Sequence, residues 1–346
     1  MSFEKALPGG QAWFRALRRS PSPWLRGLFA LVAALVLAVG VAACGDDDDD
    51  DGGDDTGGDE SALIESNPDN EAVELTIGSK NFDEQFILGE IYAQALEAAG
   101  YSVNTELNLG SEVIAKRALE EGEVDAYPEY TSTTLTSLYE VAPEDVPGDA
   151  TAAYEMANSE LQTDGLTAFP PTPFTSANAV GLLTETADEL GVETISDLEG
   201  VSQDLTLYGT TECRQRIDCL LGLEANYGLE FKGFRPVDPE LRYEVLDNGD
   251  ADLSILFTTD GQLYTDPGTY AILEDDQQLL PAGNVIVTAS QEAVDEAGED
   301  FGATIEKVQE NLTLEVMQEL NARVSLDRED PADVAADYLK ASGYIQ

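Results

Sequence analysis

The sequence predicts an α/β fold of two similar lobes, each built on a sheet of parallel-type strands, with a ligand cleft between them. Apolar runs from Val73 onward follow the order β-α-β-α-β, which is typical of parallel sheets. Residues 119–133 (LEEGEVDAYPEYTST) also match residues 246–260 (LDNGDADLSILFTTD) without a gap. A chain of 346 residues is long enough for two such lobes.

Each matching segment contains the end of a helix, a turn with Gly, a short apolar strand, and then an aromatic residue followed by hydroxyls. The aligned pairs are Leu119 and Leu246, Gly122 and Gly249, Asp125 and Asp252, Tyr130 and Phe257, and Thr131 and Thr258. Open α/β sheets bind ligands at the carboxyl ends of their strands, so both aromatic residues are expected to face the cleft. The alternative is a chance similarity between two unrelated strand ends.

Composition favours a binding protein over an enzyme. The chain has 69 acidic and 17 basic residues, a formal net charge of -52, and no His. Such a surface repels nucleic acid, and the lack of His removes the Ser-His and Cys-His nucleophile systems and the commonest zinc ligand. No calcium loop of the D-x-D-x-D-G type with a Glu at its twelfth position occurs. We therefore expect no catalytic residues, no metal site and no cofactor.

The first 43 residues are interpreted as a signal peptide. A basic segment precedes the uncharged run at 27–43, GLFALVAALVLAVGVAA, which is short for a membrane span but suits the apolar part of a signal peptide. The run leads into Cys44, and the segment Val-Ala-Ala-Cys resembles the bacterial lipoprotein signal, in which the Cys becomes the lipidated N-terminus. An uncleaved anchor helix is the alternative. Either reading places the remainder outside the cytoplasm, held at the membrane.

Residues 44–72 are expected to form the lipidated Cys and a disordered acidic tether. The Asp run at 46–51 continues into a Gly- and Asp-rich stretch without apolar periodicity. Calcium capture by the Asp run is the alternative to a solvated tether.

The first part of lobe 1 is assigned to residues 73–177. Its expected strands are 73–77, 102–107 and 124–129, and its expected helices are 84–99, 111–120 and several within 131–163. The loop at 78–83 joins a strand to a helix N-terminus and contains Lys80. It could hold an anionic group on backbone N–H donors, or be an ordinary turn with a surface Lys.

Lobe 2 is assigned to residues 178–283, and residues 284–346 are expected to return to lobe 1. The lobe 2 strands are expected at 178–183, 205–208 and 231–236, besides the matched strand, and the return strands at 270–273 and 285–288. Helices are expected at 186–191, from 196, at 221–227, and in the C-terminal run 292–297, 301–311, 313–324 and 331–340, and residues 240–246 lead into the second matching segment. Cys213 and Cys219 lie close together in a chain expected to be exported, so they are expected to form a disulfide that closes a small loop; redox catalysis is not expected, because the spacing is not C-x-x-C.

Aromatic residues near the cleft point to a quaternary ammonium ligand. Such a group makes no strong hydrogen bond and is recognised by cation–π attraction, to which each ring contributes about 0.5–2 kcal/mol. Tyr130 and Phe257 are the candidates, with core packing as the alternative for each. A carboxylate on the same ligand would need Lys80, Thr133 or Arg216 as donors. An ion pair with Asp218 is the alternative reading of Arg216.

Four segments resemble the osmoprotectant-binding proteins of ABC importers, which bind glycine betaine, choline and carnitine. They are Ile77-Gly-Ser-Lys80-Asn-Phe82-x-Glu84-Gln85, Tyr127-Pro-Glu-Tyr130-Thr-Ser-Thr133, Arg216-x-Asp218-x-x-x-Gly222-Leu223 and Thr258-Thr-Asp260-Gly261. The similarity runs from about Val73 to the C-terminus. It implies a type II periplasmic-binding-protein fold, with closure of the lobes about a hinge near Asn178 and Gly283.

The resemblance also implies roles for single residues. Lys80, Thr133 and Arg216 correspond to the carboxylate-binding positions, and Tyr130 and Phe257 to walls of the aromatic cage. Two further cage positions of the family fall on Asn178-Ala179 and on Pro281-Ala-Gly283-Asn284, and Tyr208 is a candidate replacement. The full set of expected ligand-binding residues is Lys80, Tyr130, Thr131, Thr133, Asn178, Tyr208, Arg216, Phe257 and Thr258.

We therefore expect a monomeric, lipid-anchored extracytoplasmic binding protein that delivers an osmolyte to the permease of an ABC importer. One alternative is a binder of an amino acid or polar solute, with Asn178 and Asn284 as hydrogen-bond partners. Another is a sensory ectodomain that reports a ligand without transport.

Overall fold

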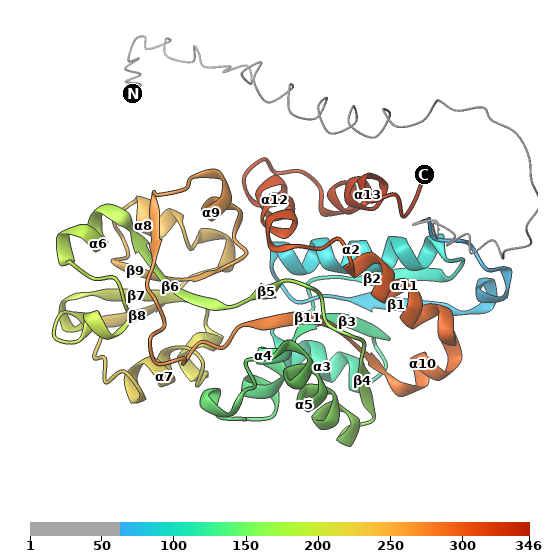
Figure 1. The fold of residues 1–346 in the computed structure, drawn as a ribbon, viewed down its shortest axis with the longest axis horizontal. Coiled ribbons are helices and arrows are strands. Elements are labelled where there is room, and N and C mark those ends of the chain that lie inside the picture. The colour runs from blue at the N-terminus through green and yellow to red at the C-terminus, as the bar shows by residue number, and fades with distance from the viewer. Residues whose placement is uncertain (1–62) are drawn as a thin grey trace, which may run out of the picture. The chain divides into compact units, whose positions relative to one another are not determined.

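The computed structural model describes residues 63–346, which lie within one compact unit. The signal peptide, the lipidated Cys44 and most of the acidic tether predicted from the sequence fall outside these residues. Two lobes make up the described part, and each contains one sheet (Figure 1).

The sheet of lobe 1 has the strand order β2-β1-β3-β11-β4, and β5 also pairs with β11. Strands β1 and β2, and β1 and β3, are parallel, whereas β11 is antiparallel to its neighbours β3 and β4. The strands are β1 (Glu74–Gly78), β2 (Ser102–Glu106), β3 (Ala126–Tyr130), β4 (Leu166–Ala168), β5 (Thr175–Ser176) and β11 (Gly283–Ser290).

Helices cover both faces of this sheet. On one face α2, α11, α12 and α13 enclose a core that includes Ile91 and Phe301, and on the other α3 and α5 enclose a core around Tyr127. The helices are α2 (Asp83–Ala98), α3 (Glu112–Glu120), α4 (Thr131–Thr133), α5 (Ala150–Thr163), α10 (Gln291–Ala297), α11 (Glu299–Gln309), α12 (Leu314–Ser325) and α13 (Pro331–Ala341).

Lobe 2 repeats this plan with shorter helices. Its strand order is β10-β6-β9-β7-β8, in which β7 is parallel to β8 and β9, and β6 is antiparallel to β9 and β10. The elements are β6 (Asn178–Leu183), α6 (Thr184–Leu190), β7 (Thr206–Gly209), α7 (Leu220–Ala225), β8 (Gly233–Pro236), α8 (Glu244–Asp247), β9 (Leu253–Phe257), α9 (Gly261–Thr265) and β10 (Tyr270–Ile272). Both sheets are thus mixed, with a parallel centre and one long antiparallel strand.

The two matching segments of the sequence occupy equivalent places in the two lobes. Gly122 and Gly249 both have left-handed backbones, with φ of 73° and 70°. The Asp three residues after each Gly accepts a backbone hydrogen bond from the neighbouring parallel strand. In lobe 1, Asp125 Oδ2 accepts from Thr76 N of β1, and in lobe 2, Asp252 Oδ2 accepts from Thr206 N of β7, both at 2.7 Å. The same turn and the same strand-joining carboxylate therefore recur in both lobes.

The chain crosses between the lobes on two adjacent segments. β5 leads out to β6, and β11 begins where the chain returns; Gly283 and Asn284 pair with Ser176 and Thr175 (Figure 1). A parallel neighbour requires a crossover connection, usually a helix, that carries the chain back before the next strand begins. Neither crossing contains such a helix, and β6 and β11 run antiparallel to the strands with which they pair. This explains why neither sheet is purely parallel.

Residues 131–163 form several helical elements, as expected, but only α5 is a long α-helix. The chain forms α4, then a π-helical turn (Thr134–Leu138) and a 3₁₀ turn (Pro143–Asp145) before α5. Thr is frequent in this stretch and Pro143 interrupts it, so a continuous helix is disfavoured.

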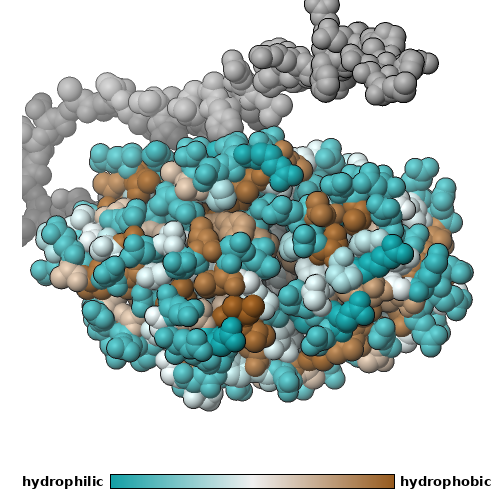
Figure 2. All heavy atoms as spheres, turned by 180° about the vertical axis from the view of Figure 1, so that it is seen from behind, coloured by the Kyte–Doolittle hydropathy of each residue, from teal (hydrophilic) through white to brown (hydrophobic). Residues whose placement is uncertain are grey.

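No helix within residues 63–346 has the length and apolar character needed to cross a membrane. On the face shown in Figure 2, hydrophilic side chains predominate, and apolar residues form separate patches between them. This surface agrees with the strongly acidic composition.

Candidate functional site

A cavity of about 180 Å³ lies between the two lobes. It is lined by the loop after β1, the start of α3 and the end of β3 from lobe 1, and by the loop after β7 and the end of β9 from lobe 2. Because the carboxyl ends of parallel strands from both sheets converge here, the cavity has the position that α/β folds give to ligand sites.

Three aromatic rings form one side of the cavity. Phe82 lies nearly parallel to Tyr130, with ring centroids 6.4 Å apart, and is tilted against Phe257 across the cleft, with centroids 5.4 Å apart. The Arg242 guanidinium lies 3.8 Å from the centroid of Phe257, and Asp260 binds this guanidinium at 2.8 Å. The rings therefore come from both lobes, and the Phe257 ring is fixed by a cation held within lobe 2.

Tyr130 is held in place by a buried carboxyl group. Its hydroxyl donates to Glu84 Oε1 at 2.6 Å, and Asn321 Nδ2 of α12 donates both to Glu84 Oε2 and to the carbonyl of Thr259 in lobe 2, each at 2.8 Å. Burial raises the pKa of Glu84 above its ordinary value of 4.5, although these hydrogen bonds act against the shift. Burial and the nearby Glu84 raise the pKa of the Tyr130 hydroxyl well above 10, so this hydroxyl stays a donor.

Lys80 is buried with a protein carboxylate as its partner. Its ammonium forms an ion pair with Glu129 of β3 and lies 4.5 Å from the centroid of Tyr130. Tyr127 and the backbone N–H of Tyr130 also donate to Glu129. The ammonium is therefore already neutralised, and it stabilises the Tyr130 ring by cation–π attraction.

Arg216 extends into the cavity from lobe 2. Its Nε and Nη2 donate to the two oxygens of Asp218 at 2.8 and 2.6 Å, and Thr136 of lobe 1 donates to the same carboxylate at 3.0 Å. Burial by itself would raise the pKa of Asp218, but the Arg216 guanidinium and these hydrogen bonds hold it below 3.8. Asp218 and Glu112 likewise raise the pKa of Arg216 against the effect of burial. Both groups are charged at neutral pH.

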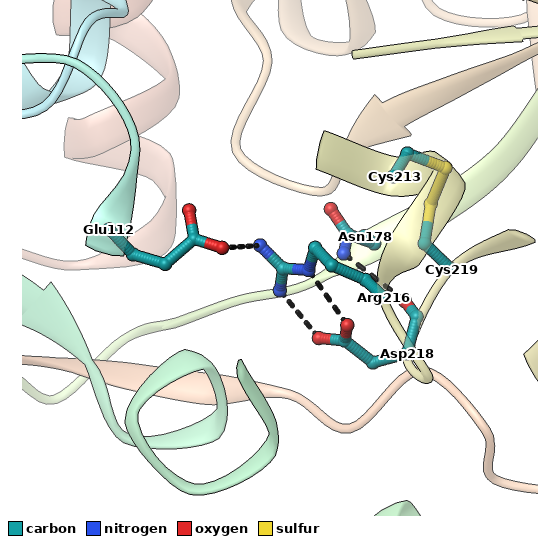
Figure 3. The surroundings of a disulfide bond; sticks show 6 residues. All are labelled: Glu112, Asn178, Cys213, Arg216, Asp218 and Cys219. Carbon is teal, nitrogen blue, oxygen red and sulfur yellow. Dashed lines mark hydrogen bonds and ion pairs between the residues drawn. A yellow bond between two sulfur atoms is a disulfide. The ribbon is translucent and has the colours of Figure 1, made fainter. Parts of the chain in front are cut away.

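A disulfide fixes the loop that carries Arg216. Cys213 and Cys219 are bonded, with their Cα atoms 5.2 Å apart, and both are buried. Asn178 Nδ2 donates to the carbonyl of Asp218 at 3.3 Å, so the loop is also attached to β6 (Figure 3). Arg216 therefore lies on a short, closed loop rather than on a free segment.

The structure brings six of the nine expected ligand-binding residues to the cavity wall. They are Lys80, Tyr130, Thr133, Asn178, Arg216 and Phe257.

The other three expected residues do not line the cavity. Tyr208 points from β7 to the opposite face of the sheet from Leu207, where it packs in the cluster around Leu246 and accepts a hydrogen bond from Arg235. The Thr131 hydroxyl accepts from Asn284 N, at 3.1 Å, and the Thr258 hydroxyl from Ala177 N, at 3.0 Å. These matched threonines each attach a strand end to one of the two crossings between the lobes.

Among the wall residues that sequence reasoning did not select, Phe82 and Glu112 matter most to the geometry of the site. Phe82 lies four residues after the end of β1, whereas Tyr130 and Phe257 are the last residues of β3 and β9, so the strand-end rule used for those two residues did not select it. Glu112 begins α3, where an acidic residue is ordinary because of the helix dipole, and nothing in the sequence marks it as part of a cleft.

Asn284 has its amide occupied by the protein. Its Nδ2 donates to the carbonyls of Thr172 and Phe174, at 2.8 and 3.0 Å, and the residue is buried. Asn284 also does not line the cavity, so it is not a polar partner on the wall, contrary to the alternative of an amino-acid ligand. Within residues 63–346, no group of three or more His, Cys, Asp or Glu side chains is arranged to hold a metal ion.

Comparison with known proteins places this geometry in a family. Residues 73–341 match the family described as the substrate-binding domain of ABC-type glycine betaine transport systems. A glycine-betaine-binding protein of Pseudomonas aeruginosa is 34% identical over 78% of this chain and 88% of its own length. The carnitine transport binding protein OpuCC of Listeria monocytogenes is 28% identical over 79% of this chain and 88% of its own length.

A solved structure agrees with these relatives. The crystal structure of a glycine betaine/carnitine/choline ABC transporter protein matches with a TM-score of 0.63 and 26% identity, over 79% of this chain and all of the other. The fold is thus the type II periplasmic-binding-protein fold that the sequence predicts. The chain belongs to the substrate-binding domain family of ABC-type glycine betaine transport systems.

Proposed function

We propose that this protein captures a quaternary ammonium osmoprotectant of the glycine betaine, choline or carnitine type outside the cytoplasm and delivers it to the permease of an ABC importer. In this proposal it performs no chemistry. A lipid on Cys44 anchors it to the outer face of the cell membrane, and the acidic segment at 44–72 spaces the lobes from that membrane.

The cluster of Phe82, Tyr130 and Phe257 at the cavity is the observation that carries this proposal. Rings from both lobes meet there, so a ligand bound against them would bridge the lobes and favour their closure. The names of the relatives support the same ligand class, because they are described as binding glycine betaine or carnitine.

The ligand-binding residues in this proposal are the six that line the cavity. Tyr130 and Phe257 would contact the ammonium group, while Thr133, Asn178 and Arg216 would supply hydrogen-bond donors. Lys80 would act through Glu129 and Tyr130, because its ammonium lies against both. Thr131 and Thr258 would hold the hinge, as their hydroxyls bond the two crossings.

Calorimetry and thermal-shift measurements on the full-length chain test the proposal. The panel contains glycine betaine, proline betaine, carnitine, choline and neutral amino acids. A ligand at 100 times its Kd should stabilise the fold by about 2.7 kcal/mol. We expect Tyr130→Ala to abolish this effect and Tyr264→Ala, an exposed aromatic away from the cavity, to leave it unchanged. A response to amino acids alone would overturn the proposed ligand class.

A further inference from the structure

Both cations expected to bind a ligand carboxylate already have carboxylate partners in the protein. Lys80 pairs with Glu129, and Arg216 makes a bidentate pair with Asp218. A ligand carboxylate would have to share or replace these partners, and a displaced carboxylate would stay buried without its cation. Such an uncompensated buried charge is costly.

The remaining nitrogen of Arg216 faces a third carboxylate. Glu112 Oε1 lies 3.5 Å from Nη1, and the Glu112 side chain is 9% exposed. Figure 3 shows Arg216 between Glu112, which approaches from lobe 1, and Asp218 of lobe 2. All three guanidinium nitrogens therefore face protein carboxylates. A ligand carboxylate placed against Nη1 would lie next to Glu112, and two like charges in such contact repel each other.

The charges around the cavity favour a cation. Its wall contains four acidic side chains, Glu112, Glu212, Asp218 and Asp238, against two basic ones, Lys80 and Arg216. The two basic groups are each neutralised by a close partner, so the excess charge that a ligand meets is negative. A ligand with a net positive charge complements this wall, whereas a zwitterion gains from its ammonium group and loses from its carboxylate.

We propose that Glu112 is a specificity-determining residue, which makes the cleft prefer a quaternary ammonium cation without a carboxylate over a zwitterionic betaine. This inference rests on the proposed function, since it assumes a quaternary ammonium ligand in the cavity. Glu112 acts by pairing with Arg216 Nη1, the guanidinium nitrogen that Asp218 does not bind, and by adding negative charge to the lobe 1 wall. Thr133 and Asn178 remain on the wall as neutral groups that suit a hydroxyl such as that of choline.

Calorimetric titration of the full-length chain with choline and with glycine betaine, at one fixed ionic strength and pH 7, measures this preference. For the unaltered protein we expect a Kd for choline at least tenfold lower than for glycine betaine. Glu112→Gln should weaken choline binding and strengthen betaine binding, so that the ratio of the two Kd values moves by tenfold or more toward betaine. Glu112→Asp, which keeps the charge, should retain a preference for choline.

Glu121→Gln is the matched control. It removes the same charge at the exposed end of the same helix, and we expect both Kd values to stay within twofold of those of the unaltered protein. Circular dichroism melts would confirm that each variant is folded.

The outcomes separate the inference from the function. If the unaltered protein binds glycine betaine as tightly as choline or more tightly, or if the Kd ratio does not change in Glu112→Gln, the inference is wrong while the proposed function stands. If the folded protein binds neither choline, betaine nor carnitine, the proposed function fails and the inference fails with it.

Discussion

Gly283 offers a direct test of how the two lobes are joined. It begins β11, pairs with Ser176 of the other crossing, and lies against Ser132 of α4. A Cβ at this position would lie 2.2 Å from Ser132 Oγ, 2.8 Å from its backbone N and 3.0 Å from its Cβ, all closer than ordinary contact. The hydroxyl can rotate away, but the backbone N cannot. We therefore expect Gly283→Ala to cost about 2 kcal/mol, or a Tm decrease of about 4–8 °C.

Gly233→Ala is the control for this experiment. Gly233 starts β8 with no atom within 4 Å of the added Cβ, so alanine there should be neutral or stabilise by up to about 1 kcal/mol. Guanidinium unfolding of both variants measures the difference, and ligand titration measures whether cleft affinity falls in Gly283→Ala. A double-mutant cycle with Ser132→Gly should show favourable coupling, because that change removes two of the three close contacts. Equal stability of Gly283→Ala and Gly233→Ala would refute the reasoning.

Three further predictions concern the strand-joining carboxylates, the buried Glu84 and the disulfide. Asp125→Ala and Asp252→Ala should each lower the free energy of unfolding by about 1.5–3 kcal/mol, because each loses one charged hydrogen bond of the same length. Urea unfolding should give values for the two variants that agree within about 1 kcal/mol, and a large disparity would contradict the equivalence of the lobes. For Glu84, the folded chain holds a proton more tightly than the unfolded chain, so stability falls as pH rises from about 4.5 through the folded pKa. Glu84→Gln lacks this dependence, so its stability relative to the unaltered protein should rise over that pH range in unfolding measurements at pH 4–8. If the free energies of unfolding of the two proteins change in parallel with pH, the raised pKa of Glu84 is refuted. Replacing both Cys213 and Cys219 by Ser should cost about 2 kcal/mol and weaken ligand binding, as measured by denaturation and calorimetry; unchanged affinity would show that the disulfide does not position the loop.

The two-lobed fold could be predicted because its signals are local and occur twice. Glycine at a left-handed turn, an Asp three residues later and a short apolar strand identify each central strand, and the structure gives Gly122 and Gly249 nearly equal φ values. The C-terminal helices were equally accessible from their periodicity; α13 was expected at 331–340 and spans Pro331–Ala341. The antiparallel direction of β6 and β11 could not be predicted from these signals, because strand direction depends on where the chain crosses between the lobes.

Parts of the site depend on contacts that a sequence does not display. Lys80 and Glu129 are 49 positions apart, and no spacing rule links them. Tyr208 was expected as a replacement for a missing residue of the aromatic cage, but the alternation of side chains places it on the other face of the sheet from Leu207. The side chain of Glu112 reaches Arg216 only because two lobes face each other, and an acidic residue at the start of a helix has a sufficient local explanation.

The differences between the lobes bear on the proposed ligand recognition. The glycine turn, the strand-joining carboxylate and the threonine that bonds a crossing are repeated in both lobes, so these features serve the fold. The loops after the equivalent strands β1 and β7 are not repeated: the first carries Lys80 and Phe82, and the second carries the disulfide and Arg216. A ligand with chemically different ends requires this asymmetry, because identical walls would bind both ends alike. Substitutions in the repeated features should therefore change stability and closure for every ligand, whereas substitutions in the unrepeated loops should change which ligand is preferred.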